Sequence, residues 1–210
     1  MQTILLIRHG ETDWNLSGQI MGDQPIPLNA TGQRQARQLA AALKDRAIRA
    51  IVTSPVLRAL QTAEILAFSV QSKVVQAAGL REIGVGEWVN RYWKDLGNEP
   101  ARHDYYAKPH EARPPGGETL NEVQQRAVAA VQEAMATNPG GSLLFVSHAD
   151  VIRTIVAHYL HTDFLTLRHA RVDHASVTGL SLTPNGADLL CLNQTTGLFT
   201  TTDPLATRRP

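Results

Sequence analysis

The chain has 210 residues, of which 43% are hydrophobic and 19% are charged, a composition that excludes a largely disordered protein. Its 20 lysines and arginines against 19 aspartates and glutamates leave a net charge of +1, so no basic surplus attracts nucleic acid. The single cysteine, Cys191, excludes intrachain disulfides and cysteine-based zinc sites, and the apolar runs are too short to span a membrane. We therefore expect a cytoplasmic protein whose partners include neither nucleic acid nor a membrane.

The first part of the chain predicts two strands and two helices. Residues 3–8 form an apolar run that is too short for a helix and is typical of a buried strand. Apolar residues then recur at helical spacing over 36–43, and residues 49–53 predict a second strand. Ser54 and Pro55 predict the N-cap and the first residue of the next helix.

The middle of the chain, residues 81–117, is rich in tryptophan, tyrosine, proline and histidine and shows no clear period. We interpret it as inserted loops and short helices that lie over the sheet edge as a lid and shape specificity. Before it, residues 73–76 predict a weak strand. After it, Thr119 and Glu122 form a capping box that opens a long helix.

The last third of the chain predicts a buried strand at 142–147, a helix over 151–160 and two strands at 176–183 and 187–193. The turn signal Pro184-Asn185-Gly186 joins these two strands into a hairpin. Strands that alternate with helices and end in a hairpin predict an α/β fold. We expect a three-layer sandwich with a mostly parallel central sheet, an antiparallel edge hairpin and helices on both faces.

No repeat or low-complexity tract divides the chain. We expect a single domain over residues 1–199, with 81–117 as its inserted lid, and a C-terminal tail over 200–210. A homodimer is left open, with the terminal hairpin or an edge strand as the contact surface.

Three predicted strands end in residues that suit anion binding. Arg8 and His9 end the first strand, Arg58 lies one turn beyond the second, and His148 follows the third. Because ligands of open α/β sheets bind beyond the carboxyl ends of the strands, two arginines and two histidines are expected at one edge. One such residue alone is more often solvated or hydrogen-bonded. Like charges crowded together cost stability unless an anion binds.

These side chains suit phosphoryl transfer. Two guanidinium groups match the oxygens of a phosphoryl group bidentately. Positive charge from Arg8 and Arg58 lowers the pKa of His9, so its neutral imidazole can attack phosphorus and form a phosphohistidine. His148 is then the second imidazole, donating to the phosphoryl oxygens.

The leaving alkoxide needs a proton, which a positioned carboxylic acid can supply. The residues alone do not choose among four candidates: Glu11, Glu82, Glu87 and Glu118. A metal hydrolase is not favoured, because no HExxH or comparable ligand spacing occurs. Three further histidines lie close in sequence, and a solvated surface is the expected place for them: His161, His169 and His174.

Ordered blocks of sequence, spread over nearly the whole chain, resemble the histidine phosphatase superfamily, which includes cofactor-dependent phosphoglycerate mutase. The main blocks are Arg8-His9-Gly10-Glu11-Thr12, Ser54-Pro55 with Arg58-Ala59, Leu80-Arg81-Glu82 with Gly86-Glu87-Trp88, Pro115-Gly116-Gly117-Glu118, and Ser147-His148 with Val151-Ile152-Arg153. The resemblance implies an α/β sandwich and assigns roles to five residues. His9 is the nucleophile, Arg8 and Arg58 bind phosphate, His148 is the second imidazole, and Glu82 is the proton donor.

The resemblance also places Asn15 and Gly22 near the substrate and implies no metal. Two departures from the family pattern stand out. Ala149 occupies a position where the family usually has glycine, which puts a methyl group beside the phosphate-facing backbone of the substrate site. Val89-Asn90 replaces a Glu-Gly pair that is common after the tryptophan, a change that removes no catalytic atom.

The leading hypothesis is a metal-independent phosphomonoesterase that hydrolyses a small phosphorylated metabolite through a phosphohistidine, without a cofactor. The first alternative is a phosphoglycerate mutase that depends on bisphosphoglycerate, for which Arg91, Arg102 and Arg113 could bind a second anionic group. Only 65 residues separate Glu82 from His148, whereas the mutase branch carries a longer insertion there. The second alternative, a catalytically silent phosphate-binding or protein-binding module, predicts a missing catalytic residue, and none is missing.

Overall fold

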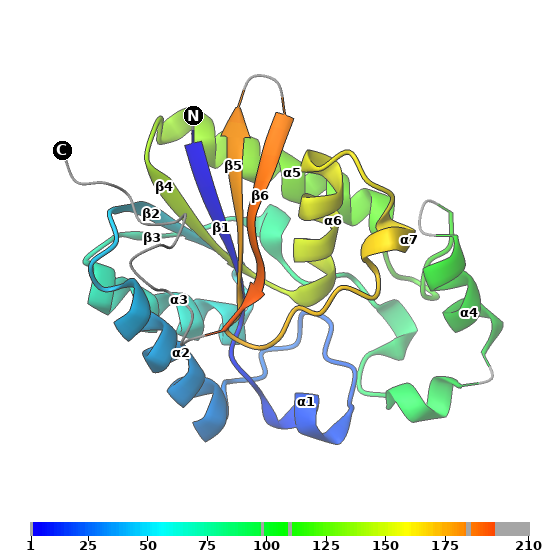
Figure 1. Ribbon diagram of the computed structural model, residues 1–210. Coiled ribbons are helices and arrows are strands. Elements are labelled where there is room, and N and C mark those ends of the chain that lie inside the picture. Colours follow the sequence, from blue (N-terminus) through cyan, green and yellow to red (C-terminus); the bar gives the residue numbers. More distant parts are fainter. Residues whose placement is uncertain (1, 98, 109–110, 184–185, 196–210) are drawn as a thin grey trace.

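The computed structural model describes residues 2–97, 99–108, 111–183 and 186–195 (Figure 1). Within these residues, six strands form one sheet in the order β3-β2-β4-β1-β5-β6. The strands are β1 (Gln2–Arg8), β2 (Ile48–Thr53), β3 (Val74–Gln76), β4 (Ser142–Ser147), β5 (Val177–Thr183) and β6 (Gly186–Gln194). The first four strands pair in parallel, and β5 and β6 pair antiparallel at one edge. The predicted sheet is confirmed.

Helices cover both faces of this sheet (Figure 1). α2 (Ala30–Leu43) and α3 (Leu57–Val70) pack on one face, and α5 (Leu120–Thr137) and α6 (Ala149–Tyr159) pack on the other. Alternate side chains of β1 divide between the two layers, since successive residues of a strand point to opposite faces. Ile4 and Leu6 join the core of α5 and α6, whereas Leu5 and Ile7 join the core of α2 and α3. The α/β sandwich is thus confirmed.

The segment 81–117 is built from short helices, as predicted. It contains η2 (Gly86–Trp88), η3 (Trp93–Leu96) and α4 (Pro100–Ala107), and η1 (Ala78–Leu80) precedes it. Trp88 and Tyr105 are about 1% exposed and meet edge to face, with ring centroids 5.9 Å apart. Buried aromatic rings therefore fasten this segment to the main core.

Three local features differ from the prediction or lie outside it. α1 (Asp13–Ser17) was not predicted; a capping box between Thr12 and Asn15 starts it. α3 begins at Leu57, with Val56 as N-cap, rather than directly after Ser54. The predicted tail, and the turn at Pro184-Asn185, lie outside the described residues.

The remaining helix is α7 (Phe164–Leu167), which follows α6. Across the described ranges, none of the helices has the length and apolar character needed to cross a membrane.

Candidate active site

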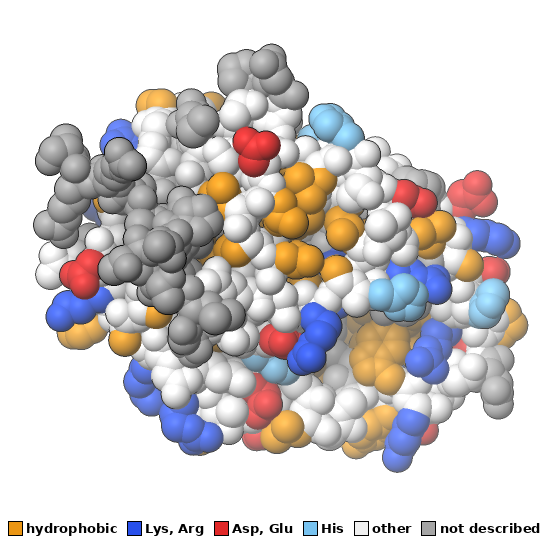
Figure 2. Space-filling view, in the orientation of Figure 1, with side chains coloured by type: hydrophobic (Ala, Val, Ile, Leu, Met, Phe, Trp, Pro, Cys, Tyr) orange, Lys and Arg blue, Asp and Glu red, His pale blue; other side chains and the backbone are white. Residues whose placement is uncertain are grey.

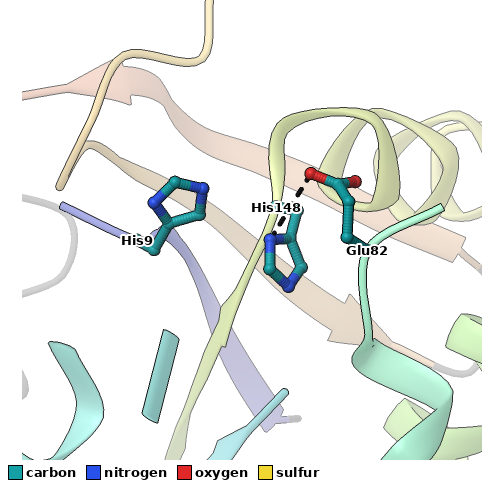
Figure 3. Close-up of side chains that lie close together, drawn as sticks. All are labelled: His9, Glu82 and His148. Atoms are coloured by element: carbon teal, nitrogen blue, oxygen red, sulfur yellow. Dashed lines mark ion pairs between the residues drawn. The ribbon is translucent and has the colours of Figure 1, made fainter. Parts of the chain in front are cut away.

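The carboxyl ends of neighbouring strands bring the predicted side chains together. β1 and β4 pair in parallel, so His9 and His148, which follow them, lie side by side with ring centroids 5.2 Å apart. Arg58 reaches both histidines from the start of α3, and Glu82 approaches from the loop after η1. Figure 3 shows the imidazole of His148 between His9 and Glu82. These four side chains surround one point at the sheet edge.

Hydrogen bonds fix the tautomer of His9. Its Nδ1–H donates to the carbonyl of Gly10 at 2.7 Å, and its Nε2 accepts from Nε of Arg58 at 3.2 Å. Burial, followed by the charges of Arg58 and Arg8, holds the pKa of His9 well below its ordinary value. The imidazole is therefore neutral at pH 7, and the Nε2 lone pair, which here accepts from Arg58, can act as a nucleophile once that contact is exchanged for a phosphoryl group.

Arg58 is fully buried and held by backbone carbonyls. Its Nη2 donates to the carbonyl of Gly22 at 2.7 Å, and its Nη1 donates to that of Gln24 at 3.2 Å. Nη2 also lies 3.7 Å from a carboxylate oxygen of Glu82. Because a guanidinium stays charged in proteins, these contacts fix a positive charge beside His9.

Arg8 carries an unused donor into the site. Its Nη1 donates to the carbonyl of Val172 at 2.8 Å, but its buried Nε has no hydrogen-bond partner among the described residues. Buried polar groups in proteins are nearly always paired, so a donor without an acceptor among the described residues suits an added ligand. An oxyanion meets that need.

Glu82 is the glutamate that the tertiary structure brings to this cluster. Its Oε2 lies 3.4 Å from Nδ1 of His148, and its Oε1 accepts from the backbone N–H of Ile83 at 3.0 Å. Burial raises its pKa, although the charge of Arg58 opposes the rise. Such a carboxyl group can hold a proton for a leaving group.

The other three candidate glutamates have different surroundings. Glu118 makes an ion pair with Arg126, and Glu11 accepts a hydrogen bond from Asn29. Glu87 is exposed. Of the four candidates, Glu82 is the one that lies beside the imidazole of His148.

Ser54 holds the second imidazole, a role that the sequence analysis missed because it assigned Ser54 to a helix cap. Its Oγ lies 2.9 Å from Nε2 of His148 and accepts from the backbone N–H of Val56 at 3.2 Å. Burial and the charge of Arg58 hold the pKa of His148 well below its ordinary value. The neutral ring thus donates from Nε2 to Ser54 and turns Nδ1 toward Arg58 and Glu82.

His174 lies beside His9, so the expectation of a solvated surface was wrong for this residue. Their ring centroids are 5.9 Å apart, and burial together with the charge of Arg8 lowers the pKa of His174 to about 4. The backbone N–H of Ala175, at positive φ, donates to the carbonyl of Arg8 at 3.0 Å and folds this turn onto β1. His161 and His169 are exposed, as expected.

A cavity of about 160 Å³ opens onto the cluster. Its lining includes most of the residues that the sequence proposed for substrate binding, namely Arg8, Asn15, Gly22 and Ala149, together with His9 and Glu82. Arg58 and His148 are fully buried and do not line the cavity, but they contact lining residues. Three aromatic residues also line it: Trp88, Trp93 and Tyr105. The cavity is therefore lined by both charged and aromatic side chains.

One group of side chains in the described part of the chain has metal-binding geometry. Ligand atoms of His9, Glu82 and His148 lie within 4.8 Å of one another. However, the guanidinium of Arg58 lies 3.2 Å from Nε2 of His9, so a cation there would meet a fixed positive charge. The electrostatics of the site favour an anion.

Comparison with known sequences shows which protein family the chain belongs to. The sequence model of the histidine phosphatase superfamily (branch 1) matches residues 4–195. A protein of Cronobacter sakazakii named probable phosphoglycerate mutase GpmB is 32% identical over 180 residues, which cover 85% of this chain and 84% of the relative. The protein of the same name from Klebsiella pneumoniae (strain 342) has the same identity and coverage.

Three solved structures have a similar fold. Phosphoserine phosphatase from Entamoeba histolytica, in complex with 3-phosphoglyceric acid, is 25% identical with a TM-score of 0.85, over 93% of this chain and 98% of that chain. Mycobacterial glucosyl-3-phosphoglycerate phosphatase, in complex with VO3, is 27% identical with a TM-score of 0.85, over 93% and 100%. YhfR of Bacillus stearothermophilus is 32% identical with a TM-score of 0.83, over 90% and 95%. The resemblance found in the sequence blocks is confirmed.

Proposed function

The chain belongs to branch 1 of the histidine phosphatase superfamily and is an enzyme, and we propose that it is a metal-independent phosphomonoesterase acting on a small phosphorylated metabolite. One observation carries this proposal. One small cavity is lined by His9, which is neutral, by Arg8, whose Nε has no partner among the described residues, and by Glu82, whose pKa burial raises. Nucleophile, anion donor and acid lie within one small space.

In the first step, the phosphoryl oxygens bind Arg8 and take over the Arg58 Nε donor from His9. The incoming negative charge raises the pKa of His148, which takes up a proton from solvent at Nδ1, donates it in a hydrogen bond to a phosphoryl oxygen and gives it back to solvent when phosphate leaves. Nε2 of His9 forms the P–N bond while the ester P–O bond breaks, and Glu82 gives its proton to the leaving alkoxide.

In the second step, Glu82 acts as the base. Its carboxylate takes a proton from water, the water oxygen bonds to phosphorus, and the P–N bond to His9 breaks. Inorganic phosphate leaves, and both side chains return to their starting protonation states. The same carboxyl serves twice because burial places its pKa above the ordinary value.

The cavity supports hydrolysis over mutase activity. A mutase must hold a second phosphate close to the first, yet the three arginines considered for that task do not line the cavity: Arg91, Arg102 and Arg113. Arg91 and Arg113 form ion pairs with glutamates.

The relatives named probable phosphoglycerate mutase keep the mutase as the second candidate. A screen of metabolite phosphates, run with and without bisphosphoglycerate, separates the two by measuring free phosphate. We expect phosphate release that does not need bisphosphoglycerate. A bisphosphoglycerate-dependent isomerisation faster than hydrolysis would decide for the mutase.

The nucleophile is tested with phosphate-labelled substrate. His9→Ala should abolish both turnover and covalent labelling, because His9 lines the cavity whereas the other imidazole of the cluster, His148, is fully buried and does not. His158→Ala, at an exposed histidine of α6, is the matched control and should keep both. Labelling that survives in His9→Ala would overturn the assignment.

A further inference from the structure

The backbone that carries Glu82 is bound by an arginine of α5. Arg126 donates from Nη1 to the carbonyls of Gly79 at 2.7 Å and Arg81 at 2.8 Å. Its Nη2 donates to the carbonyl of Glu82 itself at 3.1 Å. One guanidinium group therefore binds three carbonyls of this loop and fixes the backbone up to the candidate acid.

Glu118 holds the same loop on the other side of Glu82. Its Oε2 accepts from the backbone N–H of Gly84 at 2.7 Å, and its own backbone N–H donates to the carbonyl of Gly84 at 2.8 Å. The carboxylate also accepts from Nε and Nη2 of Arg126, both at 2.9 Å. This bidentate pair joins the contacts on the two sides of Glu82 into one network.

Arg126 and Glu118 are mostly buried, unlike ordinary surface charges. Figure 2 shows lysine and arginine side chains spread over the surface of one face of the molecule. The side chains of Arg126 and Glu118 are only 17% and 20% exposed. Although burial opposes ionisation, hydrogen bonds from Arg126 and Gly84 hold the pKa of Glu118 below its ordinary value. The carboxylate is therefore charged at pH 7, and hydrogen bonds to charged groups are roughly twice as strong as neutral ones.

Close packing also fixes the start of this loop. A Cβ at Gly79 would lie 2.5 Å from the carbonyl oxygen of Arg126, so η1 rests directly on α5. Oγ of Ser147 donates to the carbonyl of Leu80 at 2.8 Å, and Ser147 directly precedes His148. The loop is therefore anchored both to α5 and to the end of β4.

The carboxyl group of Glu82 depends on this backbone for its position. Its Oε1 accepts from the backbone N–H of Ile83 at 3.0 Å, a neighbour in the same loop. Its Oε2 lies 3.4 Å from Nδ1 of His148 and 3.7 Å from Nη2 of Arg58. A general acid must lie within about 2.6–3.2 Å of the atom that it protonates, and a misplacement of about 1 Å can cost about 100-fold in rate.

We propose that Arg126 and Glu118 are positioning residues, which hold residues 79–84 so that the carboxyl group of Glu82 meets the leaving oxygen. The inference rests on the proposed phosphatase function and deepens it at the same site. Neither residue lines the active-site cavity, so both act through Glu82 rather than on the substrate.

The leaving group tests the position of the acid. Sorbitol 6-phosphate releases an alkoxide that needs a proton, whereas p-nitrophenyl phosphate releases p-nitrophenolate, which leaves unprotonated. Arg126→Met removes all five donors and keeps a long side chain. We expect the ratio of alkyl to aryl kcat/KM to fall by about tenfold to 100-fold. A loss of folded enzyme lowers both rates alike, so it leaves this ratio unchanged.

Two conservative variants test the same contacts with less risk to folding. Arg126→Lys has a single ammonium group that cannot bind three carbonyls and a carboxylate together, so its ratio should lie between those of wild type and Arg126→Met. Glu118→Gln keeps an acceptor for the N–H of Gly84 but loses the charge that pairs with Arg126. Its ratio should also fall.

Two controls accompany these variants. Arg113→Met removes an arginine that also pairs with a glutamate of α5, Glu122, at 3.1 Å, and that contacts Gly117 rather than the loop of Glu82. It should keep the wild-type ratio. In the Glu82→Gln background, Arg126→Met should lower the ratio no further, because the proton that it positions is already absent.

Failure of the positioning role and failure of the phosphatase proposal give different results. A wild-type chain that does not hydrolyse p-nitrophenyl phosphate would overturn the phosphatase. Fast wild-type hydrolysis with an unchanged ratio in every folded variant of Arg126 and Glu118 would overturn the positioning role. The same fall in the ratio with and without Glu82 would overturn it too, whereas a fall that is absent from the Glu82→Gln background supports it.

Discussion

Replacing Glu82 by glutamine removes the proton of the candidate acid and changes little else. The glutamine amide oxygen can still accept from the backbone N–H of Ile83, which lies 3.0 Å from the carboxylate in the native chain. The side-chain volume is conserved, so the cavity keeps its shape. The variant therefore separates proton donation from packing, and its effect depends on the leaving group.

The expected loss of activity in Glu82→Gln follows from the role of Glu82 as general acid. General acid catalysis contributes about 10²–10⁴-fold, or about 2.7–5.5 kcal/mol of transition-state stabilisation. For an alkyl phosphate such as sorbitol 6-phosphate, kcat/KM should fall by this full factor in Glu82→Gln, because an alkoxide is a poor leaving group unless it is protonated. p-Nitrophenolate leaves unprotonated, so kcat/KM for p-nitrophenyl phosphate should fall by less than about tenfold.

The pH dependence has a definite sign. Burial raises the pKa of Glu82, so wild-type activity on alkyl phosphates should fall as pH rises through that pKa, and Glu82→Gln should lose this limb. A raised pKa also means that the stability contribution of Glu82 is present below its ordinary value of 4.5 and is lost as pH rises through the folded value. Glu82→Gln should therefore gain thermal stability relative to wild type above that pH.

The assay is steady-state phosphate release from both substrates across pH, with circular dichroism to follow Tm. Glu87→Gln, an exposed glutamate of the same segment, is the control and should retain wild-type rates on both substrates. An equal loss on alkyl and aryl phosphates in Glu82→Gln would refute the general-acid role and point to a binding role for the carboxylate.

Three further predictions concern the surroundings of the nucleophile. Ser54→Ala leaves the N–H groups of His148 and Val56 without an acceptor and should lower the free energy of unfolding by about 2 kcal/mol or more. We expect Tm to fall by about 4–8 °C and kcat to fall at least about tenfold. An unchanged Tm would count against this hydrogen-bond network. Gly10→Ala places a Cβ 2.5 Å from the carbonyl oxygen of Gly32 and should lower the free energy of unfolding by about 1–3 kcal/mol. A variant that is as stable as the wild type in a denaturant titration would contradict this prediction. A chelator should leave phosphate release unchanged, and a loss restored by a divalent cation would defeat the metal-free mechanism.

The fold could be predicted because its signals are local. Short apolar runs and helical periods each depend on a few neighbouring residues, and their alternation favours a parallel sheet. Parallel strands have their carboxyl ends at one edge, so Arg8, His9 and His148 could be expected there from the pattern alone. The start of α3 was misplaced because Ser54 makes its contacts with a residue far away in the chain rather than with the helix alone.

The sequence by itself determined which chemistry is present: two guanidiniums, two imidazoles and a set of carboxyl groups around predicted strand ends. Only the tertiary structure decided which carboxyl group meets the imidazoles and which histidine lies beside His9. Glu82 and His174 reach the cluster through loops whose paths are fixed by packing between elements distant in the chain. Secondary structure follows from local backbone preferences, whereas the convergence of side chains depends on long-range packing that no local pattern records.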